Sequence, residues 1–240
     1  MEMIQKILNG KVAVITGASS GIGKAIAKRF ANEGAHVVIA SRDIVKGQDV
    51  VNEIVDSGNN AIFIQCDVRR EEDIKFLFEE TMKKYQYIDI VVANAGISGG
   101  KERVIDYDLT KWSDVLQTNL TGAFLTMREG FKSMVGKGGH IIAISSQAGI
   151  EGYAGKGAYC ASKFGVRGLA HALAEEGRAF NINVSTICPG TTDTPILKAS
   201  QTNVQNPMNV DAVADAAIYL ATLRGNALVR DIVLERMILQ

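Results

Sequence analysis

Two patterns of apolar and polar residues alternate along this chain. Short uninterrupted apolar runs, such as residues 35–41 (AHVVIAS), are typical of strands that are buried on both faces. Between them lie longer stretches in which apolar residues recur every three or four positions, which is the period of an amphipathic helix. Residues 21–34 follow this second pattern, with Ile26 and Phe30 on one face and Gly34 as a helix-ending signal. The alternation predicts a series of strand–helix–strand units.

These expected elements define a fold class. Continuous apolar strands, unlike strands that alternate apolar and polar residues, suit a parallel sheet that is covered on both faces. Repeated strand–helix order suits a doubly wound arrangement, so the sequence predicts a Rossmann-like α/β fold with a doubly wound parallel sheet in three α/β/α layers. The strands are expected at residues 11–17, 35–41, 60–68, 88–96, 140–146 and 182–190, and the clearest helices at 21–34, 44–58 and 71–85. A last apolar run at residues 231–239 closes the chain.

The chain is expected to form one domain over residues 1–240, because no linker, low-complexity tract or internal repeat interrupts the pattern. A chain of this length can bury a substantial core. No apolar run approaches the roughly 20 residues that span a bilayer. Residues 1–12 (MEMIQKILNGKV) lack the long apolar core of a signal peptide. We therefore expect no membrane partner and a cytoplasmic location.

Charge and cysteine content narrow the function classes further. The formal net charge is zero, which leaves no electrostatic case for binding nucleic acid. The cysteines, Cys66, Cys160 and Cys188, are odd in number and widely spaced. Such spacing suggests neither a disulfide framework nor a zinc site, so we expect no bound metal.

A glycine-rich turn at residues 16–23 (TGASSGIG) joins the first expected strand to the first expected helix. Gly17, Gly21 and Gly23 allow a tight turn and a close approach of the backbone to a ligand. The N-terminus of the following helix offers free N–H groups and a partial positive charge, which suit a pyrophosphate. The spacing is G-x-x-x-G-x-G rather than the usual G-x-G-x-x-G. In its position after the first strand, the turn predicts dinucleotide binding.

The end of the second expected strand indicates which dinucleotide is bound. An acidic residue about 20 residues after the turn commonly binds the ribose 2′-hydroxyl of NAD, but here Ser41 and Arg42 occupy that place. Arginine can bind a 2′-phosphate with a forked hydrogen bond, whereas a carboxylate would repel it. The sequence therefore favours NADP(H). Asp43 follows directly and could reach the ribose instead, and Ser20 in the turn adds no second cation.

Residues 157–165 (GAYCASKFG) place Tyr159 four residues before Lys163 among small side chains. On a helix, residues four apart are neighbours, and a nearby cation lowers the pKa of a tyrosine from about 10. A general acid or base is tuned toward neutral pH in this way. By itself the pair also fits a surface contact with no function.

In their order along the chain, these and other motifs resemble those of the short-chain dehydrogenase/reductase family. The resemblance covers nearly the whole chain, and several spaced matches are more specific than any single motif. The matching motifs are TGASSGIG (16–23), CDV (66–68), NAG (94–96), TNLTG (118–122), ISSQAG (144–149), YCASK (159–163) and PGTTDT (189–194).

The resemblance implies roles for four catalytic residues. Tyr159 would give a proton to a carbonyl oxygen or take one from an alcohol, and Lys163 would lower the pKa of Tyr159 and bind the nicotinamide ribose. Ser146, thirteen residues before Tyr159, would hold the substrate oxygen in preference to Ser145. Asn119 would hold a water that links Lys163 to solvent. A hydroxyl donor and an acidic phenol aimed at one oxygen stabilise the negative charge that grows there during reduction.

The resemblance also implies a set of cofactor contacts. Asp67 and the Val68 backbone would meet the adenine, Thr194 and the Thr192 backbone would orient the carboxamide, and Gly190 would leave room for the nicotinamide ring. The full expected set is Gly17, Ser19, Ser20, Gly21, Ile22, Gly23, Ser41, Arg42, Asp67, Val68, Asn94, Ala95, Gly96, Tyr159, Lys163, Pro189, Gly190, Thr192 and Thr194.

The activity implied by the resemblance is hydride transfer between NADP(H) and a small-molecule carbonyl or secondary alcohol, with a 3-oxoacyl-like carbonyl as the expected substrate. The implied assembly is a homodimer or homotetramer, in contact through helices around residues 110–135 and 158–178. The alternative is a catalytically silent, dinucleotide-binding regulatory protein of the same fold. The intact Ser146, Tyr159 and Lys163 argue against that alternative.

Two segments depart from the family's pattern. Residues 231–239 (DIVLERMIL) lack the Asp-Gly-Gly that follows the last strand in many relatives, which leaves both the dimer and the tetramer open. Residues 195–209 (PILKASQTNVQNPMN) form a shorter segment than in relatives with bulky lids, so we expect an open substrate site. His171, on the helix after Lys163, is expected to be a solvated or packing residue rather than a catalyst.

Overall fold

Seven parallel strands form the central sheet of the computed structural model, which describes residues 6–199, 204–223 and 227–237. They lie in the order β3-β2-β1-β4-β5-β6-β7, and each neighbouring pair is parallel. The sheet is therefore the doubly wound one that the sequence predicts. The strands are β1 (Val12–Thr16), β2 (His36–Ser41), β3 (Asn60–Gln65), β4 (Ile90–Ala93), β5 (Gly139–Ile144), β6 (Ile182–Pro189) and β7 (Asp231–Leu234).

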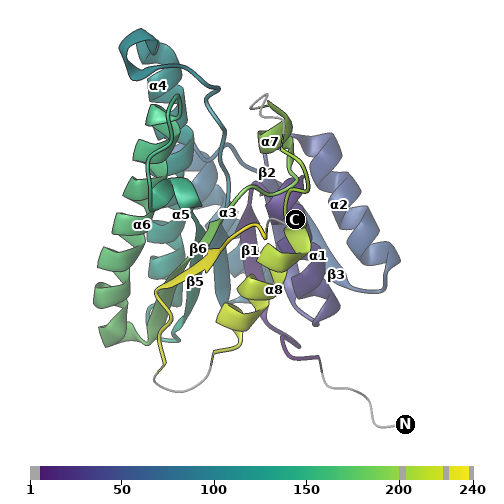
Figure 1. Ribbon diagram of the computed structural model, residues 1–240. Coiled ribbons are helices and arrows are strands. Elements are labelled where there is room, and N and C mark those ends of the chain that lie inside the picture. The colour runs from purple at the N-terminus through teal and green to yellow at the C-terminus, as the bar shows by residue number, and fades with distance from the viewer. Residues whose placement is uncertain (1–5, 200–203, 224–226, 238–240) are drawn as a thin grey trace.

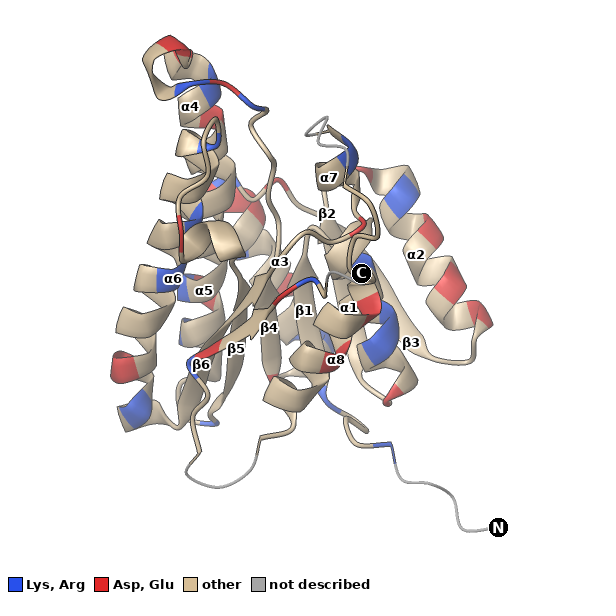
Figure 2. Cartoon of the chain, in the orientation of Figure 1, with Lys and Arg blue, Asp and Glu red and all other residues tan. Residues whose placement is uncertain are grey.

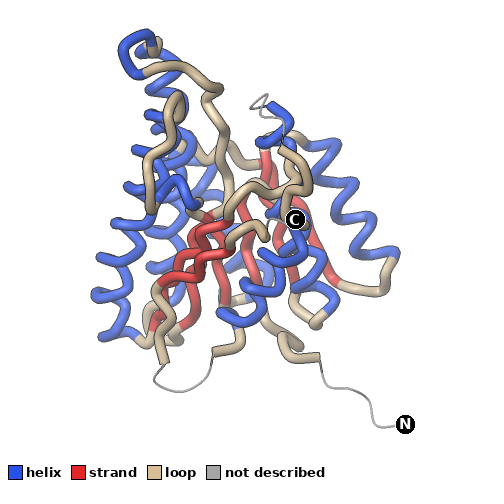
Figure 3. The backbone as a smooth tube through the Cα atoms, in the orientation of Figure 1, coloured by secondary structure: helices blue, strands red, loops and turns tan. Residues whose placement is uncertain are grey.

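Helices cover both faces of the sheet (Figure 1), and the tube in Figure 3 shows the strands between these helical layers. The predicted α/β/α layering is confirmed. One face carries α1 (Gly21–Asn32), α2 (Ile44–Asp56) and α8 (Val210–Ala221), and the other carries α3 (Glu71–Tyr85), α5 (Gly122–Met134) and α6 (Gly157–Gly177). The remaining elements are α4 (Leu109–Leu116), α7 (Pro195–Ala199) and the short turns η1 (Val104–Asp106), η2 (Gln117–Thr121), η3 (Gln147–Gly149) and η4 (Arg178–Phe180).

Two apolar cores, one on each face of the sheet, hold the helices in place. Strand β1 is buried at every position. On one face, Ile26 and Phe30 of α1 pack with residues of α2 and α8. On the other, Ile74 and Leu77 of α3 pack with residues of α5 and α6. Burying each such side chain stabilises the fold by roughly 1.5–3 kcal/mol. Each helix therefore packs against the sheet with its apolar face.

The third and fourth strands end earlier than the sequence predicts. After β4, the Asn94 side chain donates to the Thr16 carbonyl oxygen at 2.9 Å. After β3, the chain turns, and the Arg70 N–H donates to the Asp67 carbonyl oxygen at 2.9 Å. In both places polar contacts replace the strand ladder, because the backbone has reached the carboxyl edge of the sheet.

Between β4 and β5 the helices α4 and α5 run into each other through a π-helical turn, η2. The Gly122 N–H donates to the Gln117 carbonyl oxygen, five residues back. A Cβ at Gly122 would lie 2.7 Å from a methyl carbon of Val68, so only glycine fits there. Single π-helical turns inside α-helices occur frequently at functional sites. The sequence predicts the helical span but contains no signal for this turn.

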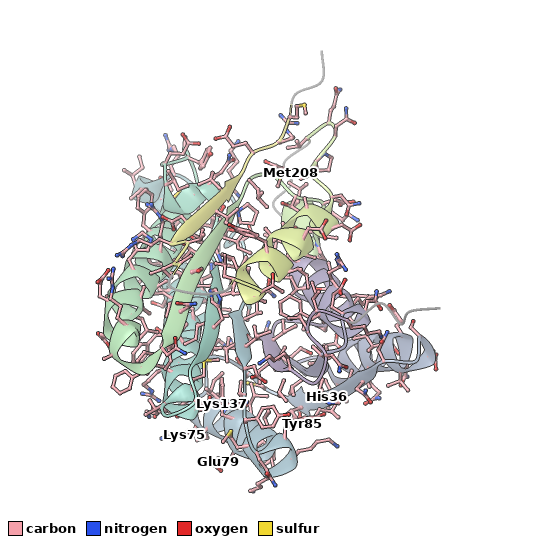
Figure 4. The ribbon with its side chains drawn as sticks, turned by 90° about the horizontal axis from the view of Figure 1, so that it is seen from below. His36, Lys75, Glu79, Tyr85, Lys137 and Met208 are labelled. Carbon is pink, nitrogen blue, oxygen red and sulfur yellow. The ribbon has the colours of Figure 1, made fainter. Side chains whose placement is uncertain are left out.

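Side-chain packing closes the amino edge of the sheet, which Figure 4 shows from below. The rings of His36 and Tyr85 stack with their centroids 5.4 Å apart. The Lys137 ammonium lies 3.5 Å from the centroid of the Tyr87 ring and pairs with Asp89 at 3.1 Å. Side chains therefore pack closely at the amino edge of the sheet. The place for a binding site is the opposite, carboxyl edge.

A partly buried ion cluster fastens the last strand, β7, to helix α6. Asp231 accepts hydrogen bonds from Arg167 at 2.8 Å, from His171 at 3.0 Å and from the Thr186 hydroxyl. Burial alone would raise the pKa of Asp231, but the hydrogen bonds from Arg167, Thr186 and His171 outweigh burial and lower that pKa to about 2. His171, on α6, thus contacts Asp231 of β7 and does not line the cavity.

An Asp231→Asn variant is expected to lower the free energy of unfolding at pH 7 by about 2 kcal/mol. A shift of the Asp231 pKa from 3.8 to about 2 corresponds to that amount. Because the folded-state pKa is depressed, this stability is present above pH 4 and is lost as the pH falls toward 2. Urea denaturation of the variant and the wild type at pH 7 and pH 3 measures it.

The exposed Asp56, at the end of α2, makes no ion pair with any described residue and supplies the matched control. Asp56→Asn should change the free energy of unfolding by no more than about 0.5 kcal/mol. A difference between Asp231→Asn and wild type that is the same at both pH values would contradict the role given to the charge of Asp231.

Within the described ranges, no helix is long and apolar enough to cross a membrane. No group of three or more His, Cys, Asp or Glu side chains among the described residues is arranged to hold a metal ion. The three cysteines are free and buried, and burial raises the pKa of the Cys66 thiol to about 12.

Candidate active site

A cavity of about 890 Å³ opens at the carboxyl edge of the sheet, which is the upper edge in Figure 1. Its wall is built from the segments that follow β1 to β6, because in a parallel sheet these segments meet at one edge. The cavity brings together residues that are far apart in the sequence, from Gly17 to Thr194. Of the site residues predicted from the sequence, all line the cavity except Gly23, Asp67 and Asn119, and each of these contacts or adjoins a residue that does.

The glycine-rich turn packs tightly against the segment after β4. Gly17 has a φ of +65°, and a Cβ there would lie 2.8 Å from the Ala95 Cα atom. A Cβ at Gly23 would lie 2.5 Å from the Asn94 side-chain nitrogen. Ser20, the N-cap of α1, makes no side-chain hydrogen bond to the helix amides. The turn thus presents backbone N–H groups at a helix N-terminus to the cavity, which fits a pyrophosphate.

The two charged residues that follow β2, Arg42 and Asp43, make different contacts. The Asp43 carboxylate caps α2, accepting from the Lys46 N–H at 3.0 Å, and it pairs with the Lys46 ammonium at 3.3 Å. Arg42 is exposed, lines the cavity and makes no ion pair with any described residue. The Ser41 hydroxyl is buried and donates to the Asp43 carbonyl oxygen at 3.0 Å. A phosphate in this part of the cavity would meet Arg42 and Lys46, and the sequence interpretation missed Lys46.

Asp67 and Val68 form the next part of the wall. The Arg69 guanidinium donates to both Asp67 carboxylate oxygens at 3.0 Å, and this contact holds the pKa of Asp67 below its usual value. The Asp67 N–H donates to the Asp73 carboxylate at 3.0 Å. Val68 is buried and faces the cavity beside Cys66. The Asp67 carboxylate is therefore already engaged by Arg69.

Tyr159 and Lys163 lie one turn apart on α6, and Ser146 lies at the end of β5 beside them. The Lys163 side chain is 4% exposed, and its ammonium donates to the Ile144 carbonyl oxygen at 2.8 Å. The same ammonium lies 5.7 Å from the centroid of the Tyr159 ring. The Ser146 hydroxyl donates to the Pro189 carbonyl oxygen at 3.4 Å and accepts from the Ala148 N–H at 3.1 Å. The three side chains line one cavity wall.

Ser145, the alternative to Ser146, is turned away from this group. Its hydroxyl is buried and donates to the Lys163 carbonyl oxygen at 2.9 Å. A Cβ at Gly149 would lie 2.4 Å from that hydroxyl oxygen. Ser145 thus holds α6 against the end of β5, and Ser146 is the serine beside Tyr159.

The pKa of Tyr159 differs from the expectation. Burial raises the pKa of the Tyr159 phenol, and a hydrogen bond with Ser146 only partly opposes this. The expected lowering by Lys163 is absent because the Lys163 ammonium is directed to Ile144 rather than to the phenolic oxygen. Burial lowers the pKa of Lys163 itself to about 8, which keeps most of its ammonium protonated at pH 7. Tyr159 is thus a protonated phenol at neutral pH, the form that a proton donor requires.

Asn119 lies in the π-helical turn η2 and joins three elements. Its side-chain oxygen accepts from the Ile97 N–H at 2.7 Å, and its nitrogen donates to the Ile97 carbonyl oxygen at 2.9 Å and to the Ser162 hydroxyl at 3.1 Å. The side chain therefore ties the segment after β4 to α6, between Tyr159 and Lys163. A Cβ at Gly96 would lie 3.2 Å from the Asn119 side-chain oxygen. The water-holding role of Asn119 stays a prediction.

The segment after β6 closes the cavity. The Gly190 N–H donates to the Leu234 carbonyl oxygen of β7 at 2.7 Å. The Thr192 hydroxyl donates to the Gly190 carbonyl oxygen at 3.0 Å, and the Thr194 hydroxyl accepts from the Leu197 N–H at 3.2 Å. The short segment expected to leave the site open forms helix α7 at its start, while residues 200–203 lie outside the described residues.

Several lining residues were missed by the sequence interpretation. The signal that could have found Lys156 is its position three residues before Tyr159, one turn along the same helix start. Gln147 lies inside the ISSQAG motif, and the remaining ones lie in segments that carry no family motif. The missed residues include Lys46, Ile97, Ser98, Lys101, Gln147, Tyr153, Lys156 and Ile196.

Residues 11–205 match the family model described as short chain dehydrogenase. The match covers most of the chain, so the protein belongs to the short-chain dehydrogenase/reductase family. It is therefore an oxidoreductase of that family, which binds a nicotinamide dinucleotide.

Individual relatives are similar over most of their length. The 3beta-hydroxysteroid dehydrogenase of Mediterraneibacter gnavus is 39% identical over 198 residues, covering 82% of this chain and 72% of the relative. A short-chain type dehydrogenase/reductase from Mycobacterium marinum has a TM-score of 0.90 at 31% identity, covering 97% of each chain. A 3-ketoacyl-(acyl-carrier-protein) reductase from Brucella melitensis, complexed with NADH, has a TM-score of 0.86 at 28% identity, covering 94% of this chain and 97% of that one. The names of these relatives span different substrates.

Proposed function

We propose that this protein interconverts a carbonyl compound and a secondary alcohol with NADP(H), and that it works as a carbonyl reductase on an oxoacyl-like substrate. The observation that carries the proposal is one cavity lined by two sets of residues. The first set, the glycine-rich turn and Arg42, fits a phosphorylated dinucleotide. The second set, Ser146, Tyr159 and Lys163, fits acid–base chemistry at a carbonyl oxygen.

In the proposed reduction, NADPH supplies a hydride to the carbonyl carbon when it is bound. The Ser146 hydroxyl and the Tyr159 phenol donate hydrogen bonds to the carbonyl oxygen, where negative charge grows. Tyr159 then gives its proton to that oxygen, which completes the alcohol. Lys163, a buried cation whose ammonium donates to the Ile144 carbonyl oxygen, binds the nicotinamide ribose. Asn119 holds the segment after β4 against α6, next to Tyr159 and Lys163, through its hydrogen bonds to Ile97 and Ser162.

The choice of NADP(H) rests on the end of β2. Arg42 lines the cavity and makes no ion pair with a described residue, and Lys46, which pairs with Asp43, lines the same cavity. Asp43, the alternative partner for a ribose hydroxyl, is engaged in capping α2. The Brucella melitensis relative is complexed with NADH, so the fold by itself does not require a 2′-phosphate on the dinucleotide. The local charges therefore support NADP(H).

The proposed assembly is a homo-oligomer in contact through α4, α5 and α6. Phe124 of α5 and Phe164 of α6, on neighbouring helices, are 40% and 45% exposed and offer apolar surface for such a contact. Light scattering at micromolar concentration is expected to give at least twice the mass of one chain. A monomer under those conditions would contradict this assembly.

The direct test of the proposed function is NADPH oxidation, followed by absorbance, with a panel of ketones and oxoacyl thioesters. We expect turnover of at least one carbonyl class and a lower kcat/KM with NADH than with NADPH. Binding of NADPH without turnover of any carbonyl, or of any secondary alcohol in the reverse direction, would instead favour the silent dinucleotide-binding protein.

A further inference from the structure

Charged side chains around the cavity are strongly unbalanced toward positive charge. Three of these side chains have a place in the proposed function: Arg42 after β2, Lys46 in the first turn of α2, and Lys163 on α6 near Tyr159. The other two cations of the wall have no role in it. Among the described residues that line the cavity, one is negatively charged, Asp43. The positively charged ones are Arg42, Lys46, Lys101, Lys156 and Lys163.

The two unused cations, Lys101 and Lys156, are held on the same wall by backbone pairing. The Glu102 N–H donates to the Gly155 carbonyl oxygen at 3.0 Å, and Glu102 and Lys156 form a parallel bridge. The stem of Lys101 lies over Gly155, whose φ is +77°, and a Cβ there would come within 2.9 Å of the Lys101 Cγ atom. Glycine at position 155 thus makes room for the Lys101 side chain beside Lys156.

No carboxylate of the described residues neutralises this pair. The Lys156 ammonium donates to the Gly100 carbonyl oxygen at 3.0 Å and to the Ser98 hydroxyl at 3.3 Å, both uncharged acceptors. Neither Lys101 nor Lys156 forms an ion pair with a described residue, whereas Glu102 is engaged by Lys111 at 3.1 Å. Burial and the charge of Lys101 together lower the pKa of Lys156. An ammonium has three donors, so Lys156 retains one for a further acceptor.

We propose that the substrate carries an anionic group, a carboxylate or a phosphate, at the end opposite its reacting carbonyl, and that Lys101 and Lys156 bind this group. The inference rests on the proposed function, because it assumes a carbonyl held at Tyr159 in the same cavity. Two like charges placed together repel each other, and an anion between them converts this repulsion into attraction. Lys156 lies one residue before α6 and three before Tyr159, so both ends of such a substrate are bound by one stretch of chain.

The test compares oxo acids with their neutral methyl esters as substrates for NADPH oxidation. The series runs from 4-oxopentanoate to 7-oxooctanoate, with a phosphate arm of 4-oxopentyl phosphate against 5-hydroxypentan-2-one. For the best chain length, we expect kcat/KM of the anion to exceed that of its neutral partner by roughly tenfold or more, since charge-assisted hydrogen bonds contribute on that scale. The arm with the larger ratio distinguishes a carboxylate from a phosphate.

Variants test which residues produce that preference. In Lys101→Gln the anion-over-neutral ratio should fall to within about threefold of unity, and in Lys156→Arg, which keeps the charge, a clear preference should remain. The control is Lys75→Gln, which removes one exposed positive charge from α3 (Figure 4). Lys75 does not line the cavity, so this variant should leave the ratio unchanged. An anion-over-neutral ratio near one in the wild type, while the ketones are reduced, would overturn the inference and leave the proposed function standing.

A binding measurement covers the case in which none of these compounds is reduced. Hexanoate and hexanamide are titrated into the wild-type protein with NADPH present, and the nucleotide fluorescence reports binding. Tighter binding of hexanoate that is lost in Lys101→Gln would uphold the anion site although the proposed reaction had failed. Equal affinity for the two compounds would overturn the site as well.

Discussion

A Tyr159→Phe variant is expected to lose nearly all turnover while it still binds NADP(H) within about twofold of the wild-type Kd. The substitution removes only the phenolic hydroxyl, and a general acid of this kind contributes roughly 10²–10⁴-fold to the rate. The pKa of Tyr159 is raised by burial, so the hydroxyl carries its proton at neutral pH and is the acid of the proposed step. The measurements are kcat with the best carbonyl from the panel and Kd from nucleotide fluorescence.

Tyr153 supplies a matched control for that experiment. It lines the same cavity, but its hydroxyl donates to Glu151 at the exposed rim rather than standing beside Ser146. A Tyr153→Phe variant is expected to keep most of the wild-type kcat. More than about a tenth of the wild-type kcat in Tyr159→Phe, or equal losses in the two variants, would remove Tyr159 from the role of proton donor.

An Arg42→Asp variant is expected to reverse the cofactor preference from NADP(H) toward NAD(H). Loss of the guanidinium removes charge-assisted hydrogen bonds to the 2′-phosphate, which contribute about 1.5–3 kcal/mol or roughly 10- to 100-fold in affinity. The new carboxylate adds repulsion against the phosphate and can accept a hydrogen bond from the free 2′-hydroxyl of NAD. The measurement is kcat/KM with both cofactors in wild type and variant.

Asp43→Asn separates the two candidate residues at the end of β2. Because asparagine can also cap a helix, this substitution should change the stability of α2 little and leave the preference for NADP(H) in place. A wild type that already prefers NAD(H), together with a loss of NAD(H) affinity in Asp43→Asn, would mean that Asp43 governs the pocket instead of Arg42.

The sequence was sufficient for the architecture because local patterns specify it. The continuous apolar runs that became β1 to β7 and the helical stripe that holds Ile26 and Phe30 carry their own period, whatever their neighbours. The order of strands and helices then leaves few topologies open. Most of the candidate site followed for the same reason, since its residues come directly after strands and the carboxyl ends of parallel strands share one edge. Gly17 and Ser146 are examples.

Tertiary structure alone decided the features that depend on which distant groups meet. No spacing in the sequence places the Lys163 ammonium on the Ile144 carbonyl oxygen, and this contact is why burial, rather than a neighbouring cation, sets the pKa of Tyr159. The Asp231 cluster and the pairing that brings Lys101 beside Lys156 likewise join segments far apart in the chain. A pKa or an ion pair depends on distance and burial within a few ångströms. A linear pattern contains the participating groups but not their separations, which arise only when the whole chain has packed.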